Sequence, residues 1–168
     1  MNTTSLLIGN ASNLLAMISD YFSATRKTAK GILWVQIISQ FFYFLGSVVL
    51  KGYSSAVQNV ISIIRNLVAI NNIQSKFLER LLFVLGIVLG LTFNNLGVMG
   101  LLPVIANLQY TLCVFKFKGD ERALKISFAV TCAFFAVFNI AILNFVGVGS
   151  NLIIIIATIV ILTKEKRK

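Results

Sequence analysis

The sequence predicts an all-α membrane protein with seven transmembrane helices in a 3+1+3 arrangement of two parallel repeats. Hydrophobic residues make up 58% of the 168 positions and charged residues only 12%, whereas soluble domains have about 25% charged residues. The basic residues also fall in short clusters between long apolar runs. We therefore expect residues 1–168 to form a single membrane domain whose first partner is the lipid bilayer.

The lengths of the apolar runs set the number of spans. Because about 20 helical residues cross a hydrocarbon core of ~30 Å, longer runs must fold back. A first span is expected at about Ser5 to Thr25. Polar and turn-forming residues then divide three longer runs into six spans: Gly31 to Gln74 at Lys51 to Ser55, Phe77 to Phe115 at Asn94 to Gly97, and Ile126 to Thr163 at Asn144 to Asn151.

The distribution of Lys and Arg supports this count, since cytoplasmic loops carry the excess of basic residues. Alternate connections are basic: Arg26, Lys27 and Lys30 in the first, Lys76 and Arg80 in the third, Lys116, Lys118, Arg122 and Lys125 in the fifth, and Lys164, Lys166, Arg167 and Lys168 in the tail. The opposite side carries only Lys51, and Arg65 lies within a span. We expect the N-terminus outside and the basic tail, residues 164–168, in the cytoplasm.

Seven spans can divide into two triplets of the same orientation, a plan known in transporters. The expected boundaries are 5–75 and 98–163 for the triplets, with a linker helix at 77–96. Short matches support this division, because SNL at Ser12 to Leu14 aligns with ANL at Ala106 to Leu108, and Asn59 aligns with Asn151. In the linker helix, the spacing of Gly86 and Gly90 favours close helix contact.

Three segments resemble a known family: GILWVQIISQFFYFLGSVVLKGYSSAVQNVISIIRNLVAI after the basic first loop, LLPVIANL at Leu101 to Leu108, and FKFKGDERALK at Phe115 to Lys125. They are similar to the YgjV-like bacterial inner-membrane proteins, over most of the chain. The resemblance implies a distant relation to MtN3/SWEET, PQ-loop and PnuC-type seven-helix proteins, a 3+1+3 fold in the bacterial inner membrane, and passage of a solute. It implies no substrate. The Pro-Gln pair of PQ-loop members is missing, because Val104 follows Pro103.

A polar stripe runs along the third span. Its members recur at the spacing that places residues on one helical face: Ser55, Gln58, Asn59, Ser62, Arg65 and Asn66. Charged residues within membrane helices usually face the bundle interior or a water-filled cavity, so we expect Arg65 to face protein or water. The alternative is that Arg65 reaches the cytoplasmic headgroups by snorkelling.

The first and second spans carry stripes of their own. Asn13 and Asp20 share one face of the first span, and Gln36, Ser39, Gln40, Tyr43 and Ser47 follow one another on the second. A buried Arg has a large desolvation cost that a neighbouring carboxylate reduces. Because Asp20 and Arg65 lie at similar depth, we expect them to form an ion pair.

The stripes together predict a polar cavity between the triplets. Its candidate residues, for a substrate site or pathway, are Arg65, Asn59, Gln58, Ser62, Asn13, Asp20, Gln40, Tyr43 and Asn107. Hydrogen bonding between helices is the alternative explanation for the amides and hydroxyls. Trp34, Tyr43 and Phe135 are candidates to stack on a ring or sugar, with belt or core packing as the simpler alternative.

These features favour a transporter or facilitator for a small polar or anionic solute, with Arg65 as the anchor and rocking-type alternating access. The alternative is a non-transporting receptor or assembly protein that holds a peptide or helix in the same cleft. The sequence leaves a homo-oligomer open.

Other functional classes are not expected. An enzyme would need paired acids, a nucleophile with a base, or metal ligands, yet the chain has no His and Asp20 is the one acid within a span. Cys113 and Cys132 lie in apolar runs away from other ligating residues, so we expect no metal and no cofactor. Despite the net charge of +10, no aromatic and basic residues interleave on a polar surface, so nucleic acid is not an expected partner.

Overall fold

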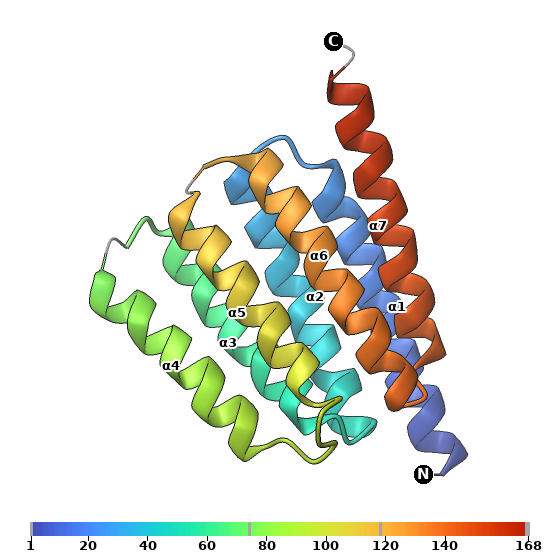
Figure 1. The fold of residues 1–168 in the computed structure, drawn as a ribbon. Helices are drawn as coiled ribbons and strands as arrows, with labels where there is room; N and C mark the ends of the chain where they lie inside the picture. Colours follow the sequence, from blue (N-terminus) through green and yellow to red (C-terminus); the bar gives the residue numbers. More distant parts are fainter. Residues whose placement is uncertain (1, 74, 118, 167–168) are drawn as a thin grey trace.

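The computed structural model describes residues 2–73, 75–117 and 119–166, and these residues contain seven α-helices and no strand (Figure 1). The helices are α1 (Thr3–Thr25), α2 (Ala29–Val49), α3 (Tyr53–Ile70), α4 (Lys76–Thr92), α5 (Leu101–Lys116), α6 (Glu121–Ala141) and α7 (Phe145–Lys166). The predicted all-α class is confirmed. Gln74, Lys118, Arg167 and Lys168, which entered the predictions of runs, loops and tail, lie outside the described residues.

Side-chain caps set several helix starts. Thr28 and Asp120 accept hydrogen bonds from the backbone N–H of Gly31 and Ala123, at 3.1 and 3.0 Å, as residues of this kind commonly do at a helix N-terminus. The predicted break at Asn144 to Asn151 is too long. Asn144 caps α7 by accepting from the N–H of Gly147 at 2.9 Å, so the helix already begins at Phe145 and contains the following glycines.

Within the described residues, the helices form two layers of three with α4 outside them. In one layer α2 packs between α1 and α3, and in the other α6 packs between α5 and α7. Contacts of α3 with α5 and of α1 with α7 join the layers at their edges, and α2 meets α6 at the centre. The linker helix α4 packs against α3 and α5, at the left of Figure 1.

Gly90 allows α4 to approach its neighbours closely. A Cβ atom at Gly90 would overlap Nε2 of Gln58 and would lie 2.6 Å from Cγ2 of Val104. A Cβ atom at Gly86 would lie 3.4 Å from Cδ2 of Leu108, which is an ordinary contact distance. The close helix contact predicted for this pair is therefore confirmed at Gly90 and not at Gly86.

The turn between α2 and α3 has the same backbone geometry as the turn between α6 and α7. Lys51 and Leu143 adopt φ angles of 59° and 56°, which are uncommon for non-glycine residues. The next residue of each turn, Gly52 or Asn144, donates its N–H to Ser47 or Asn139 at 2.8 or 2.9 Å. The end of α3 has the same geometry, because Asn72 adopts a φ angle of 54° and Ile73 donates its N–H to Val68 at 3.2 Å, so these turns follow a common helix ending.

The buried faces of α2 and α6 also correspond. Each buried position of α2 has a buried counterpart in α6 at the same spacing: Ile32, Leu33, Gln36, Ser39, Gly46 and Ser47 in α2, and Leu124, Lys125, Phe128, Thr131, Phe138 and Asn139 in α6. Two related triplets would have this property. The repeat boundaries given above stay a prediction.

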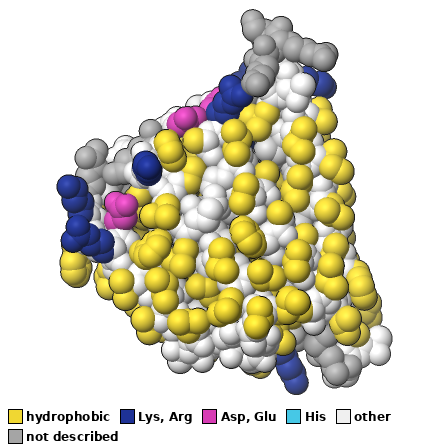
Figure 2. Space-filling view, in the orientation of Figure 1, with side chains coloured by type: hydrophobic (Ala, Val, Ile, Leu, Met, Phe, Trp, Pro, Cys, Tyr) yellow, Lys and Arg dark blue, Asp and Glu magenta, His cyan; other side chains and the backbone are white. Residues whose placement is uncertain are grey.

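The outer surface of the bundle is apolar, and polar side chains are concentrated inside it. Large hydrophobic side chains are exposed on every described helix, including Ile18, Phe41, Val60, Val84, Leu112, Val137 and Ile156. Figure 2 shows hydrophobic side chains over most of the visible face, with Lys and Arg at its upper rim and lower end. Buried polar residues are as numerous as buried hydrophobic ones among the described residues. Such a distribution suits helices surrounded by lipid.

Three helices are long and apolar enough to cross a membrane by length and composition alone: Ala29–Val49, Glu121–Ala141 and Phe145–Lys164. Leu101–Lys116 is a shorter apolar helix. The helix α4 has 17 residues, and polar side chains lower the mean hydropathy of α1 and α3. The crossing of the membrane by all seven helices, and the orientation of the termini, stay predictions.

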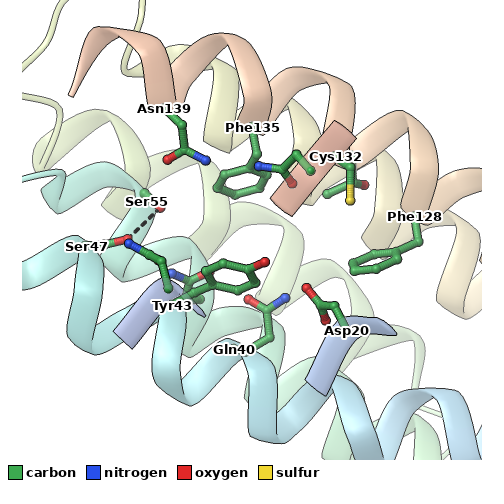
Figure 3. A pocket seen from close by; sticks show the side chains of 13 residues that line it. Asp20, Gln40, Tyr43, Ser47, Ser55, Phe128, Cys132, Phe135 and Asn139 are labelled. Atoms are coloured by element: carbon green, nitrogen blue, oxygen red, sulfur yellow. Dashed lines mark hydrogen bonds between the residues drawn. The ribbon is translucent and has the colours of Figure 1, made fainter. Parts of the chain in front are cut away.

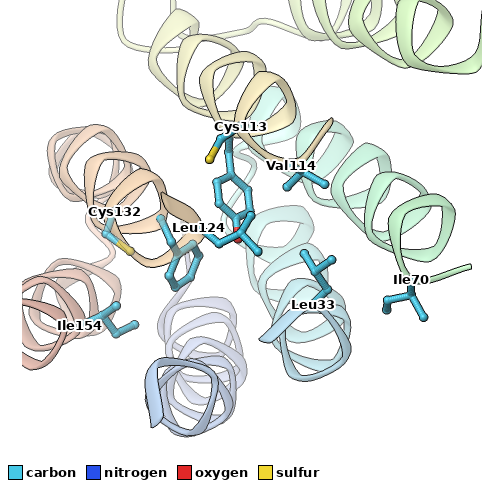
Figure 4. Packing of buried hydrophobic residues seen from close by; sticks show 9 residues of the cluster. Leu33, Ile70, Cys113, Val114, Leu124, Cys132 and Ile154 are labelled. Atoms are coloured by element: carbon cyan, nitrogen blue, oxygen red, sulfur yellow. The ribbon is translucent and has the colours of Figure 1, made fainter. Parts of the chain in front are cut away.

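Two hydrophobic clusters pack between the layers, toward opposite ends of the bundle. The larger one contains Leu33, Ile70, Tyr110, Cys113, Val114, Leu124, Phe128, Cys132 and Ile154, and Figure 4 shows these side chains reaching into the interior from several helices. The smaller one, Leu50, Phe138 and Ile142, lies beside the two equivalent turns. The polar interior lies between these clusters.

Candidate functional site

A polar cavity lies at the centre of the bundle between the two layers (Figure 3). The volume open to the centre of a water-sized sphere is about 30 Å³, whereas one water needs about 10–15 Å³ by this measure. The residues that line it come from α1, α2, α3, α6 and α7: Asn13, Asp20, Gln40, Tyr43, Ser47, Ser55, Asn59, Phe128, Thr131, Cys132, Phe135, Asn139 and Asn151. The space suits water or a small ion, and it is too small for a sugar or nucleoside.

The cavity contains several polar atoms without a hydrogen-bond partner. Unpartnered buried side-chain atoms occur on six described residues, and three of these residues, Asp20, Tyr43 and Asn59, line the cavity. Oδ1 of Asp20, the Tyr43 hydroxyl and Nδ2 of Asn59 are the atoms concerned. An unpaired buried polar group costs about 1–3 kcal/mol, and water or a small polar solute in the cavity would reduce that cost.

Opposite layers supply opposite walls of this cavity. Figure 3 shows Asp20, Gln40 and Tyr43 on one side, facing Phe128, Cys132 and Phe135 of α6. Phe128 and Cys132 also belong to the larger hydrophobic cluster, and Phe135 packs against the smaller one. The walls of the cavity are therefore continuous with the two apolar clusters.

Arg65 belongs to a separate polar network between α3 and α5. Its Nη1 atom donates to Oδ1 of Asn107 at 2.7 Å and to the Thr111 hydroxyl at 3.3 Å, and its Nε atom donates to Oδ1 of Asn66 at 3.0 Å. The guanidinium carbon lies 4.6 Å from the ring centroid of Tyr110, within the range of a cation–π interaction. Arg65 is only 1% exposed, so it does not snorkel to the headgroups.

Asn107 connects this network to the linker helix. Its Oδ1 atom accepts from Ser62 at 2.7 Å as well as from Arg65, and its Nδ2 atom donates to Oε1 of Gln58 at 2.6 Å. Gln58 then donates to the backbone carbonyl of Gly86 in α4 at 2.8 Å. We refer to Gln58, Ser62, Arg65, Asn66, Asn107 and Thr111 as the arginine network.

The predicted ion pair between Asp20 and Arg65 is wrong for the described residues. The hydrogen bonds of Arg65 go to Asn66, Asn107 and Thr111, and Oδ1 of Asp20 has no partner. The physical reason is the order of the helices, because α2 lies between α1 and α3. Similar positions along their helices therefore did not bring Asp20 and Arg65 together.

The predicted site residues divide between these two places. Asn13, Asp20, Gln40, Tyr43 and Asn59 line the cavity. The other four belong to the arginine network: Gln58, Ser62, Arg65 and Asn107. They form hydrogen bonds between helices, which is the alternative explanation given above for such residues. Their role in a pathway stays a prediction.

Of the aromatic candidates, Tyr43 and Phe135 line the cavity. Trp34 is 48% exposed on the outer surface, so it takes no part in this cavity.

Sequence reasoning singled out only Phe135 of α6. Phe128, Thr131, Cys132 and Asn139 also line the cavity. Their spacing places them on one face of a helix, so a signal was present. It was overlooked because aromatic residues and a cysteine interrupt the polar residues of that face.

No group of three or more His, Cys, Asp or Glu residues that could hold a metal ion occurs in the described part of the chain. The cavity has one carboxylate and is otherwise lined by amides, hydroxyls, aromatic rings and a thiol. This set can bind through a single charge, hydrogen bonds and ring faces.

Comparison with protein families gives one match. A model of the Imp-YgjV family, described as bacterial inner membrane protein, covers residues 7–168. The comparisons with curated proteins and with solved structures gave no match.

Proposed function

Because the chain belongs to this family of bacterial inner membrane proteins, we propose that it carries a small polar solute across the inner membrane through the central cavity. The observation that carries the proposal is a cavity lined mainly by polar residues at the centre of the bundle, with a hydrophobic cluster beside it toward each end. A carrier needs a central space of this kind and apolar contacts that can part on either side of it.

Alternating access would open one cluster at a time. The second helices of the two layers share a buried pattern, which supports a repeat in which one layer rocks against the other. The small cluster of Leu50, Phe138 and Ile142 would part on one side, and the larger cluster on the other.

Transport explains the cavity better than catalysis does. The chain contains no His, and Asp20 is the one acid among the cavity residues. Acid–base or nucleophilic chemistry requires a second group suited to accept or deliver the proton. We therefore propose passage without chemical change.

The native thiol in the cavity provides a test that needs no known solute. The chain has two cysteines, and only Cys132 lines the cavity, so a Cys113→Ala protein reports on Cys132 alone. In right-side-out and inside-out vesicles, a membrane-impermeant methanethiosulfonate reagent should modify Cys132 from both sides. A Cys132→Ala protein, which retains Cys113, is the matched control.

The second test measures flux directly. Proteoliposomes should swell faster than empty liposomes in at least one of urea, glycerol or methylammonium chloride, followed by stopped-flow light scattering. Cys132→Leu fills the cavity and should abolish this flux, whereas Val130→Leu changes a 42% exposed side chain of the same helix and should not. A Cys132 that is inert from one side, together with no flux, would overturn the carrier and favour a non-transporting receptor or assembly protein.

A further inference from the structure

The formal charges around the cavity have one sign. Among its described lining residues, Asp20 is the only one with a charged side chain, and no Lys or Arg takes part. Arg65 is occupied by Asn66, Asn107 and Thr111 in the arginine network. The cavity is therefore unsuited to an anion, contrary to the prediction that Arg65 would anchor one.

The surroundings of Asp20 lack a compensating charge. Asp20 is 1% exposed, and its carboxyl group lies close to the hydroxyls of Ser39 and Tyr43, yet Oδ1 has no hydrogen-bond partner. A charged group buried without a partner is costly in a protein interior and more so within a membrane. A cation in the cavity would remove that cost.

The remaining walls suit a cation with N–H donors. The Asp20 carboxylate, the Gln40 amide and the Tyr43 hydroxyl can each accept a hydrogen bond from it. Phe128 and Phe135 add ring faces on the opposite wall (Figure 3), and aromatic faces attract ammonium groups. The volume of about 30 Å³ limits the ligand to a small one.

We propose that the central cavity binds ammonium or a small primary amine in its protonated form, with the Asp20 carboxylate as the counter-charge and the aromatic rings of α6 as the opposite wall. This inference rests on the proposed function for the passage of the cation, but its binding can be measured without transport. A divalent metal fits less well, because Mg²⁺ and Ca²⁺ favour several oxygen ligands with more than one carboxylate.

The test measures thermal unfolding of the purified full chain in detergent against increasing methylammonium chloride. N-methylglucamine chloride, whose cation is too large for the cavity, keeps the ionic strength constant. A ligand that binds the folded protein raises the midpoint temperature of unfolding as the ligand concentration increases. The midpoint of the wild type should therefore rise with methylammonium concentration. Asp20→Asn should weaken binding about 100-fold, as expected for loss of a charge-assisted contact. The matched control is Glu79→Gln, which removes a carboxylate from the first turn of α4.

A second variant distinguishes binding of an amine from binding of an inorganic ion. It also tests the proposal if Asp20→Asn does not fold. Phe128→Leu removes a ring face, so it should weaken methylammonium binding about tenfold and leave any response to sodium unchanged. A midpoint that responds to sodium but not to methylammonium would overturn the proposal, as would an equal methylammonium response in Asp20→Asn. Binding without flux would support the site and overturn only the carrier.

Discussion

Arg65 and Asp20 differ in how their charges are accommodated, although both are 1% exposed. Arg65 donates to three residues and lies against the Tyr110 ring. Asp20 has an oxygen without a partner and faces a cavity. Burial of a charge therefore does not by itself reveal its role, whereas the hydrogen bonds show that Arg65 joins α3 to α5 and that Asp20 is not held by a comparable network.

The largest expected effect comes from breaking the arginine network. Arg65→Met leaves the acceptors on Asn66 and Thr111 unpaired between buried helices. We expect a loss of about 2–4 kcal/mol in the free energy of unfolding, measured by SDS titration in mixed micelles. Arg65→Lys keeps the charge without the planar guanidinium group. Its free energy of unfolding should therefore lie between those of the wild type and Arg65→Met. An Arg65→Met protein as stable as wild type would contradict a structural role for the network.

Asn107 and Asn13 provide a matched pair, because the sequence alignment places them at equivalent positions of the two triplets. Asn107→Ala removes contacts with Gln58, Ser62 and Arg65 and should cost about 1–3 kcal/mol of unfolding free energy. The side chain of Asn13 donates only to the carbonyl of Gly9 in its own helix, so Asn13→Ala should cost less than about 1 kcal/mol. Equal losses of unfolding free energy for Asn107→Ala and Asn13→Ala in the same SDS titration would contradict the described difference between the arginine network and the cavity.

The attachment of α4 can be tested with its two glycines. Gly90→Ala would press a methyl group against Gln58 and Val104 and should destabilise the protein by about 1–3 kcal/mol. Gly86→Ala meets its neighbour at ordinary contact distance and should change stability by less than about 0.5 kcal/mol. Thermal unfolding of both proteins checks this order, and the reverse order would disprove the close approach at Gly90.

The smallest loss of stability among the two buried charges is expected at the cavity. Without added amine, Asp20→Asn removes a buried charge that has no compensating partner, so the free energy of unfolding should stay within about 1 kcal/mol of wild type or rise. The SDS titration used for Arg65→Met makes the two results directly comparable. A loss as large as that for Arg65→Met would show that Asp20 is structural, and it would remove the contrast between the two places.

Much of the architecture could be predicted from local sequence, since apolar runs and turn residues act on their own neighbours. The helices and the close contact at Gly90 were predicted in this way. The extent of the break at Asn144 was misjudged, because one capping side chain is enough to start α7. Five of the predicted site residues do line the cavity, since polar stripes must face away from lipid.

The sequence by itself determined that the first three helices are apolar on one face and polar on the other, because their polar residues recur with helical periodicity. Only the tertiary structure decided which polar faces meet. With α2 between α1 and α3, and α5 against α3, Arg65 faces Asn107 while Asp20 faces α6 across a cavity. That outcome depends on the order of helices in space, which periodicity along a single helix does not contain.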